Sequence, residues 1–388
     1  MKKVAIITST RAEFGLLMPV IQQLRSYENE NFRVDLVVTG THLVESYGNT
    51  IDEIKQLKIR INKTIRISTD SNSPQDISNN QADTLIKFSK LFMNEKYNGI
   101  VILGDRYEML AVAIAAGNTH TPIFHLCGGD TTEGAIDEWI RHSISKMSYL
   151  HFVSNDDSYN RVVQLGESPD RVFNYGSTSI DNILYFADMP KLEALNSIGL
   201  DDCKYAVCTY HPVTMEDGNL DKLVEDFLGA IKTFPNIEFI ITKSNADQGG
   251  AYINELLDKA NKEIENLHVF ASLGVKRYLS LMKYSAFVLG NSSSGIIETP
   301  AFGVPTVNIG DRQRGRLQSK SIINCLEDTK SIVDAIKKAL DDDFVEMSRK
   351  VVSPYGDGHA AENISKKIYD VVTTDKIDLK KKFYDVGK

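Results

Sequence analysis

Acidic side chains follow apolar runs at two places in the first half of the chain, where they are suited to proton transfer. Asp105 and Arg106 come directly after the apolar run 99–103, while Asp130 and Asp137 lie in a glycine-rich loop before a helix-compatible segment. Acids gathered in a partly dry site acquire different pKa values, so that one removes a proton while another donates one. The alternative is that Asp105 and Asp137 only cap helices, a common role of aspartate. For Asp137, the two roles are compatible.

A second constellation, GNSSSG at 290–295, has the composition of a phosphate-binding loop. A Ser/Gly loop that opens a helix presents unpaired backbone N–H groups and hydroxyls at the positive end of the helix dipole. The carboxylate of Glu298, further along, is able to accept both hydroxyls of a ribose. The segment therefore favours a nucleotide diphosphate, although an ordinary turn with a serine N-cap has the same composition. Because Pro300 follows so soon, we expect a short or kinked helix with Glu298 near the irregularity.

Other polar residues also stand at the ends of expected strands, where an α/β sheet collects its ligand-binding groups. His211 precedes Pro212, which fixes an extended backbone, so a site residue is favoured over a core histidine. Polar residues are common in any loop, but arginine and histidine suit phosphate, and paired acids suit proton transfer. The residues that follow expected strands are Arg11, His42, Asp105, Arg106, Asp130, Asp137, His211, Asn245, Asp247 and Ser292.

The elements that must position these residues alternate buried strands with amphipathic helices. We expect strands at 4–8, 34–39, 99–103, 122–126, 150–154, 205–209, 238–242, 268–270 and 286–289, a first helix at 15–27 and a loop or lid at 67–80. Short apolar strands separated by helices predict parallel sheets covered on both faces. The predicted fold class is α/β, with two Rossmann-like, doubly wound domains and the active site in the cleft between them.

Chain length and a break in the pattern indicate where the domains divide. With 388 residues, the chain exceeds the size of about 250–300 residues at which single cores stop growing. The alternation is interrupted near 176–204. We predict an N-terminal domain at 1–176, on which the tail 359–388 packs back, and a C-terminal, nucleotide-binding domain at 177–358.

Composition argues against several classes of function. The net charge of −8 argues against a nucleic-acid surface, and no run approaches the roughly 18 apolar residues of a membrane span. The cysteines, at 127, 203, 208 and 325, lack metal-binding or redox spacing, so we expect reduced thiols in a cytoplasmic protein. Since HExxH, GxSxG and GxGxxG are absent, a protease, an esterase and a dinucleotide dehydrogenase are unsupported.

The order of the motifs resembles that of the hydrolysing UDP-N-acetylglucosamine 2-epimerases of sialic-acid biosynthesis. An ordered set is far more specific than any one motif. The resemblance implies a glycosyltransferase-B-like fold with a UDP-sugar in the cleft. The matching segments span 8–316 and are Thr10-Arg11-Ala12-Glu13, Gly40-Thr41-His42 with Tyr47-Gly48-Asn49-Thr50, Gly104-Asp105-Arg106, Ile136-Asp137 with Ile140-Arg141-His142, His211-Pro212, the GNSSSG loop with Glu298, and Gly310-Asp311-Arg312-Gln313.

The same resemblance implies a reaction and a role for each residue. The family removes the proton at C2 of the sugar while UDP leaves C1, and water then adds, giving UDP and N-acetylmannosamine. No cofactor or metal is needed, and we expect a homo-oligomer, a dimer or a tetramer. By position, the UDP-binding residues are Arg11, His42, Arg106, Asn245, Ser292, Ser293, Glu298 and Arg312, and the catalytic residues are Asp105, Asp130, Asp137 and His211.

One position departs from the family pattern. Many members have glutamate within a His-x-Glu-Gly-Gly motif where this chain has Cys127. A free thiol titrates near ~8.5 and does not simply replace a carboxylate base near neutral pH. Either Asp130 supplies the acid, or the pocket accepts another substituent at C4 or C6, which keeps UDP-N,N′-diacetylbacillosamine open as the substrate. Three further functions stay open: a non-hydrolysing epimerase, a UDP-sugar glycosyltransferase and a catalytically silent UDP-sugar sensor.

Overall fold

The chain divides into two compact units. The computed structural model describes residues 1–45, 48–70, 73–132, 136–211, 220–243, 250–374 and 377–387. One unit comprises Met1–Asp181 and Tyr355–Lys388, and the other comprises Asn182–Pro354. The predicted boundaries after 176 and after 358 lie within five residues of these divisions. The predicted site residue Asn245 lies outside the described residues, as do Tyr47, Pro212 and Asp247.

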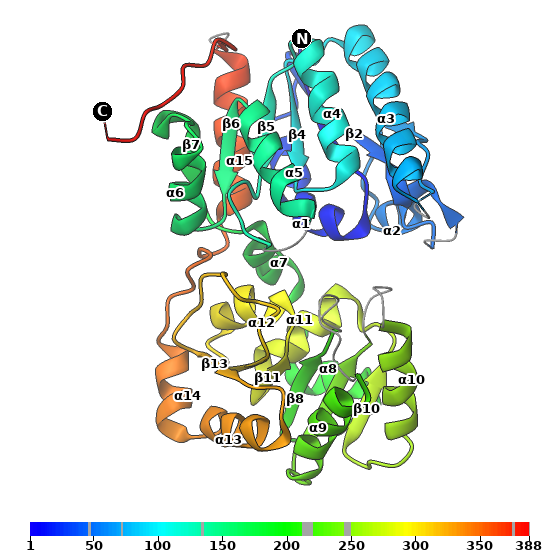
Figure 1. Ribbon diagram of the computed structural model, residues 1–388, viewed down its shortest axis with the longest axis vertical. Coiled ribbons are helices and arrows are strands. Elements are labelled where there is room, and N and C mark those ends of the chain that lie inside the picture. Colours follow the sequence, from blue (N-terminus) through cyan, green and yellow to red (C-terminus); the bar gives the residue numbers. More distant parts are fainter. Residues whose placement is uncertain are drawn as a thin grey trace. The chain divides into compact units, whose positions relative to one another are not determined.

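A seven-stranded sheet forms the centre of the first unit (Figure 1). Its order is β3-β2-β1-β4-β5-β6-β7, and every neighbouring pair is parallel. All five residues of the central strand β4 are buried, as expected for a parallel sheet that is covered on both faces. The strands are β1 Lys2–Thr8, β2 Phe32–Thr39, β3 Lys63–Ile65, β4 Gly99–Leu103, β5 Ile123–Leu126, β6 Leu150–Val153 and β7 Val172–Asn174.

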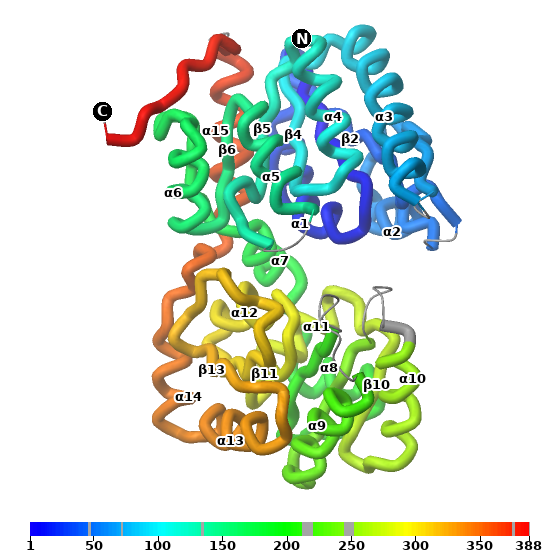
Figure 2. Tube along the Cα trace, in the orientation of Figure 1, coloured from blue at the N-terminus to red at the C-terminus, as the bar shows by residue number. Residues whose placement is uncertain are grey.

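The helices of the first unit include one from the far end of the chain. Helix α15 packs along α1, where the rings of Tyr369 and Tyr27 stack with centroids 4.8 Å apart. The segment beyond α15 returns beside α6, and Tyr384 N–H donates to Gly166 O at 2.9 Å (Figure 2). The elements are α1 Arg11–Ser26, η1 Gly40–Leu43, α2 Ile51–Gln56, α3 Pro74–Glu95, α4 Tyr107–Asn118, α5 Ile136–Met147, α6 Asp156–Gln164, η3 Pro169–Arg171, α7 Thr178–Phe186, which continues past the division, and α15 Ala360–Thr373.

The second unit repeats the plan with a six-stranded parallel sheet in the order β10-β9-β8-β11-β12-β13. The predicted class, two doubly wound α/β domains, is thus confirmed. No helix in the described ranges, α3 with its 22 residues included, is long and apolar enough to cross a membrane. The elements are α8 Lys191–Asn196, β8 Tyr205–Thr209, α9 Leu220–Lys232, β9 Glu238–Thr242, α10 Gly250–Ala260, β10 Leu267–Phe270, α11 Gly274–Tyr284, β11 Phe287–Gly290, α12 Ser293–Ile297, η4 Thr299–Phe302, β12 Thr306–Ile309, β13 Ile322–Cys325, α13 Thr329–Ala339 and α14 Asp342–Arg349.

Helix starts account for the main differences from the sequence-based prediction. Helix α1 begins at Arg11 rather than Gly15, because Thr10 and Glu13 form a reciprocal capping box. The expected loop at 67–80 is wrong from Pro74 onward, since Ser73 caps α3 and proline suits the first helical position. The expected irregularity at Pro300 is confirmed, because α12 ends at Ile297 and the 3-10 turn η4 follows.

Candidate active site

Arg141 joins the acidic segments of the first unit into one network. Its side chain, on α5, is only 4% exposed and ion-pairs with Asp105. The guanidinium also donates to the backbone carbonyl of Asp130 at 2.8 Å, to Thr132 Oγ1 at 2.8 Å and to Glu138 Oε2 at 3.2 Å. Charge-assisted bonds of this kind are strong. The loops after β4 and β5 are therefore fixed to the same buried cation.

Asp137 is the acid whose surroundings favour proton exchange. It lies half-buried in the first turn of α5. Burial, and after it the negative charge of Asp105, raises the pKa of the Asp137 carboxyl. An aspartate with a raised pKa is better matched to proton transfer near neutral pH than an ordinary one. The structure thus brings two of the predicted acids into one electrostatic environment.

Asp130 is tied into the scaffold. Its Oδ1 accepts hydrogen bonds from Ser154 Oγ at 2.8 Å and from Ser158 Oγ at 2.6 Å, which fasten the loop to the start of α6. Near it, Cys127 adopts a left-handed φ of 61°, and its N–H donates to Phe152 O at 3.0 Å. A non-glycine residue in this region is strained, a feature that clusters at functional sites.

Two arginines of the first unit present charge at the surface. Arg11, in the first turn of α1, is 59% exposed and its Nε lies 3.1 Å from Glu53 Oε2. Arg106, the N-cap of α4, is 41% exposed and its Nε donates to Glu108 Oε1 at 2.8 Å. Although each Nε has an acidic partner, both side chains stay partly exposed, as an anion-binding role requires.

His42 is buried, with both ring nitrogens engaged. Nε2 lies 3.0 Å from Thr8 Oγ1, and Nδ1 lies 2.7 Å from Thr50 Oγ1. Burial lowers the pKa of the imidazole to about 4, so it is neutral near pH 7. A neutral, enclosed ring has no charge to offer a phosphate. We therefore propose that His42 shapes the turn in which it lies rather than contacting the ligand directly.

In the second unit, Asn291 fixes His211 beside the serine loop. The strands β8 and β11 are neighbours, and the Asn291 side chain accepts from His211 N–H and donates to His211 O, both at 2.8 Å. Gly290, the last residue of β11, has a φ of 136°, and a Cβ at this position would lie 2.0 Å from the backbone oxygen of Thr209, the last residue of β8. Only glycine allows this approach. His211 and the serine loop are therefore held at one edge of the sheet.

The serine loop itself opens a very short helix. Ser292 is the N-cap of α12 and accepts from Ser294 N–H at 3.4 Å, while Ser293 is the first helical residue. Helix α12 has only five residues, so its dipole contributes little. The donors that this loop offers are therefore its N–H groups and hydroxyls.

Arg312 and Glu298 lie around this loop. Arg312 donates to Asn291 O at 3.0 Å, and Gln313 Nε2 donates to the same oxygen at 2.8 Å. Glu298 is the C-cap of α12, and its charge is among the influences on the pKa of Tyr278, which burial raises to about 12. Arg312, Glu298 and several neutral donors thus lie around the loop.

Three buried residues of the first unit, which connect its strand-end loops, were not predicted to be site residues: Ser9, Glu13 and Glu108. Glu13 carried a usable signal, since Thr-x-x-Glu is the sequence of a capping box. Asn291 was noted only as part of the GNSSSG motif, and no separate role was predicted for it. Asparagine directly after a buried strand is a useful indicator, because its side chain has both a donor and an acceptor for a neighbouring strand end.

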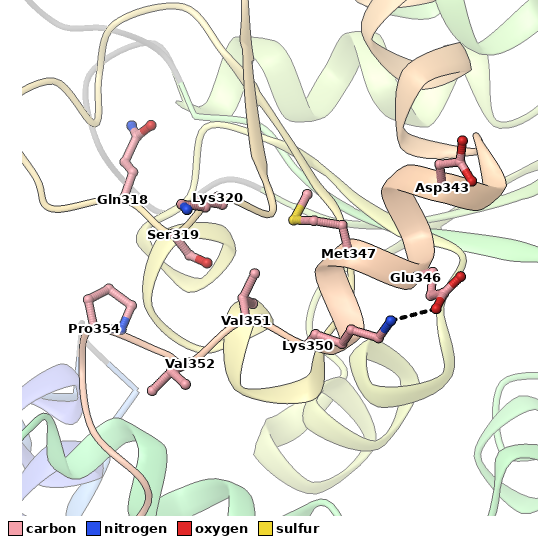
Figure 3. Close-up of a pocket in the computed structure, with 10 residues that line it drawn as sticks. All are labelled: Gln318, Ser319, Lys320, Asp343, Glu346, Met347, Lys350, Val351, Val352 and Pro354. Atoms are coloured by element: carbon pink, nitrogen blue, oxygen red, sulfur yellow. Dashed lines mark hydrogen bonds and ion pairs between the residues drawn. The ribbon is translucent and has the colours of Figure 1, made fainter.

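Two of the cavities lined by described residues belong to the second unit. The larger, about 700 Å³, is bounded by 318–320, by α14 and by the segment after it (Figure 3). None of the predicted site residues lines it. The smaller, about 410 Å³, is lined by Gly310 and Asp311, next to Arg312, and by 324–327. Within the part of the chain that the structure describes, no group of His, Cys, Asp or Glu side chains is arranged to hold a metal ion.

Comparisons with known proteins identify the family. A sequence profile of the family described as UDP-N-acetylglucosamine 2-epimerase matches residues 25–369. The polysialic acid biosynthesis protein P7 of Escherichia coli is 37% identical, over 100% of this chain and 98% of its own length. The GDP/UDP-N,N′-diacetylbacillosamine 2-epimerase (hydrolyzing) of Campylobacter jejuni is 41% identical, over 83% of this chain and 84% of its own length. The crystal structure of Methanocaldococcus jannaschii UDP-GlcNAc 2-epimerase in complex with UDP-GlcNAc and UDP has a TM-score of 0.76 at 19% identity, covering 95% of this chain and 99% of that chain. The chain belongs to the UDP-N-acetylglucosamine 2-epimerase family.

Proposed function

We propose that this protein is a hydrolysing UDP-N-acetylglucosamine 2-epimerase, which converts UDP-N-acetylglucosamine and water into N-acetylmannosamine and UDP. The observation that carries the proposal is the pair of acids at the start of α5 and after β4. Asp137 is half-buried with a raised pKa, and Asp105 beside it is paired with Arg141. A family member that acts on C2 needs an acid poised to exchange the C2 proton. The Campylobacter jejuni relative, which is named as hydrolysing, supports the use of water.

In the proposed reaction, Asp137 takes the C2 proton as the bond between C1 and the diphosphate oxygen breaks. The electrons of the C2–H bond form a C1=C2 double bond, and UDP leaves with the electrons of the C1–O bond. Cations and hydrogen-bond donors that face the diphosphate lower the barrier, because charge develops on the leaving group. Arg106 is the proposed cation at the leaving group, while Arg312 and the hydroxyls of Ser292 and Ser293 are proposed to bind UDP to a similar extent in the substrate and in the leaving group.

Hydration completes the proposed cycle. Water adds its oxygen to C1 of the glycal, and a proton is delivered to C2 on the face opposite to the one that lost it. Asp105, a carboxylate paired with Arg141, is proposed to take the proton that water loses, and His211 is proposed to donate the proton to C2, since both stand at strand ends. Asp137 then releases its proton to solvent, and the cycle can start again. Asp130, whose carboxylate accepts from two serines, is proposed to hold the loop rather than to move a proton.

A second candidate substrate is UDP-N,N′-diacetylbacillosamine, a 6-deoxy sugar with an amide at C4. Two observations favour it: the printed name of the 41% identical relative, and Cys127 in the loop where many members have glutamate. The reaction class is the same for both sugars. Comparing kcat/KM for the two nucleotides decides between them, with the preferred substrate expected to be ahead by more than about tenfold.

Turnover in heavy water tests the proposed mechanism. We expect one deuterium at C2 of the free sugar, with UDP released in equal amount, as seen by NMR. UDP release without deuterium at C2 would rule out the elimination. If UDP-N-acetylmannosamine persists as the final product, the enzyme is non-hydrolysing, and sugar transfer to an added acceptor would indicate a glycosyltransferase.

A further inference from the structure

Three strand-end loops of the first unit meet at one buried residue, Ser9. Its backbone oxygen accepts from Thr41 Oγ1 at 3.1 Å and from His42 N–H at 3.3 Å. Its hydroxyl lies 2.9 Å from Glu13 Oε2 and 2.8 Å from Glu108 Oε1. Ser9 is completely buried, and the two glutamates are 5% and 2% exposed. The loops after β1, β2 and β4 are therefore connected through a single serine and two enclosed carboxyl groups.

The number of protons available for these hydrogen bonds determines the protonation state of the two carboxyl groups. A serine hydroxyl has one proton to donate, but Ser9 Oγ is at hydrogen-bond distance from two carboxyl oxygens. If both carboxyls were ionised, one of these contacts would be two oxygens facing each other without a proton. Both contacts are hydrogen bonds only if one carboxyl is protonated and donates to Ser9. The other two oxygens, Glu13 Oε1 and Glu108 Oε2, are buried without a partner among the described residues, which also disfavours two negative charges.

The neighbours of each carboxyl show which one carries the proton. Glu108 Oε1 accepts from Arg106 Nε at 2.8 Å, so its negative charge is paired with a cation. Among the described residues, Glu13 Oε2 contacts only neutral groups of its own loop: it accepts from the N–H groups of Ser9 and Thr10, and it lies 2.9 Å from the Ser9 hydroxyl. Burial, and after it the charge of Glu108, raises the pKa of Glu13 to about 8, against the lowering effects of Ser9 and Arg106. The proton belongs on Glu13.

We propose that Glu13 and Glu108 are positioning residues: a buried carboxyl pair that shares one proton and holds the Arg106 guanidinium in place for the diphosphate of the substrate. This inference rests on the proposed function, because it is the UDP-sugar that supplies the diphosphate. With Glu13 neutral, Glu108 and Arg106 balance each other and the guanidinium still attracts an anion. Loss of the shared proton adds a negative charge behind Arg106 and weakens that attraction.

Few other charges face the pair. Arg11, on the same helix as Glu13, is exposed and lies against Glu53. His42, from η1, is neutral near pH 7 because its pKa is about 4. Asp137, on α5, interacts electrostatically with both Arg106 and Glu108, and its own pKa is raised. The part of the pH dependence that Glu13→Gln removes is therefore the part assigned to Glu13.

Isothermal titration with UDP tests the proposal directly. Between about pH 7 and about pH 8.5 UDP keeps one charge state, since a terminal phosphate has its second pKa near ~6 and the uracil N–H loses its proton only at higher pH. The wild-type Kd is expected to rise by about threefold over this range. Glu13→Gln, which keeps the shape of the neutral acid, is expected to bind UDP with a nearly constant Kd. Glu108→Gln is expected to weaken UDP binding about tenfold at both pH values, because Arg106 loses its anchor.

A matched control and an independent readout separate the outcomes. Glu95→Gln removes a carboxylate of the same unit that pairs with Lys3 and Lys63, and it is expected to keep the wild-type pH dependence. If Glu13→Gln keeps that dependence as well, the proposal is overturned. If the wild type does not bind UDP at any pH, the proposed function fails instead.

The proton on Glu13 is also measurable without a ligand or a variant. In protein labelled with ¹³C at the glutamate carboxyl carbon, NMR should show one glutamate that titrates near pH 8, and Asp137, whose pKa is also raised, stays silent in this label. A wild type in which no glutamate titrates above about pH 7 would overturn the shared proton whatever the function is. In folded Glu13→Gln, the resonance should disappear.

Discussion

The acidic rim of the first unit, which comprises Asp105, Asp137 and the Arg141 that pairs with Asp105, differs from the serine loop of the second unit, 290–295, in the kind of bonds that hold it. Around Asp105, ion pairs predominate: Arg141 is buried among carboxylates, and the pKa of Asp137 is raised by burial and by a neighbouring charge. Around Ser292, the bonds are mostly neutral, and Asn291 fixes the backbone of His211. The contrast suggests a division of work. Under the proposed function, protons move where charges are crowded, and the second unit holds the nucleotide mainly through neutral, preorganised donors.

The largest expected effect comes from removing the titrating acid. Asp137→Asn is expected to lower kcat by about 10³-fold, as for loss of a general acid or base, while the Kd for UDP stays within about twofold. Steady-state kinetics and UDP titration on the same preparation measure both. Unchanged turnover would show that the acidic rim is structural, and the comparison between the two regions would lose its basis.

Asp105→Asn should have the next largest effect, with kcat falling by roughly 10²-fold. It also has a signature in the pH profile. The charge of Asp105 raises the pKa of Asp137, so removing it lowers that pKa. If the ionised Asp137 is the base, activity rises as pH increases through its pKa, and the acid side of the kcat profile therefore moves to lower pH in the variant. A shift to higher pH would contradict this coupling.

Arg312→Ala is expected to act on binding, raising the Kd for UDP by about tenfold with kcat within about threefold of the wild type. A charged hydrogen bond contributes about 1.5–3 kcal/mol, and a charge at the surface is screened by salt. The loss in affinity should therefore shrink at high ionic strength. A fall in kcat as large as that of Asp105→Asn would show that Arg312 acts in the chemical step, against the proposed assignment of the second unit to nucleotide binding.

Structural features that depend on residues close together in the sequence could be predicted from the sequence. Buried strands, the parallel arrangement and the irregularity at Pro300 follow from apolar runs and from proline geometry. The start of helix α3 was not predicted, because its first residues are polar and that composition outweighed the Ser73-Pro74 start signal. The information for this helix start is nevertheless local, since a serine N-cap followed by proline is a recognisable pair.

Other features depend on contacts that no local pattern contains. The hydroxyl of Ser9 reaches Glu108 across 99 positions of sequence, and Arg141 reaches Asp105 across 36. His42 follows a strand in the same way as a ligand-binding histidine does, and only its burial between Thr8 and Thr50 shows that its ring is enclosed. Such pairings are set by how the loops pack together, which the order of residues alone does not specify.

The smallest expected effect tests the neutral side of the comparison. Ser293→Ala removes one hydroxyl from the serine loop without changing the helix start, which Ser292 caps. One hydroxyl among several donors to the diphosphate contributes about 1 kcal/mol, so the Kd for UDP should rise by about fivefold. Because no charge is removed, this loss should be nearly the same at low and high salt, unlike that of Arg312→Ala. Ser197→Ala, which removes a hydroxyl of the same unit outside the loop, is the control and should leave the Kd as it is. A salt-dependent loss in Ser293→Ala would mean that the serine acts through a charged neighbour, and the loop would then belong with the acidic rim rather than in contrast to it.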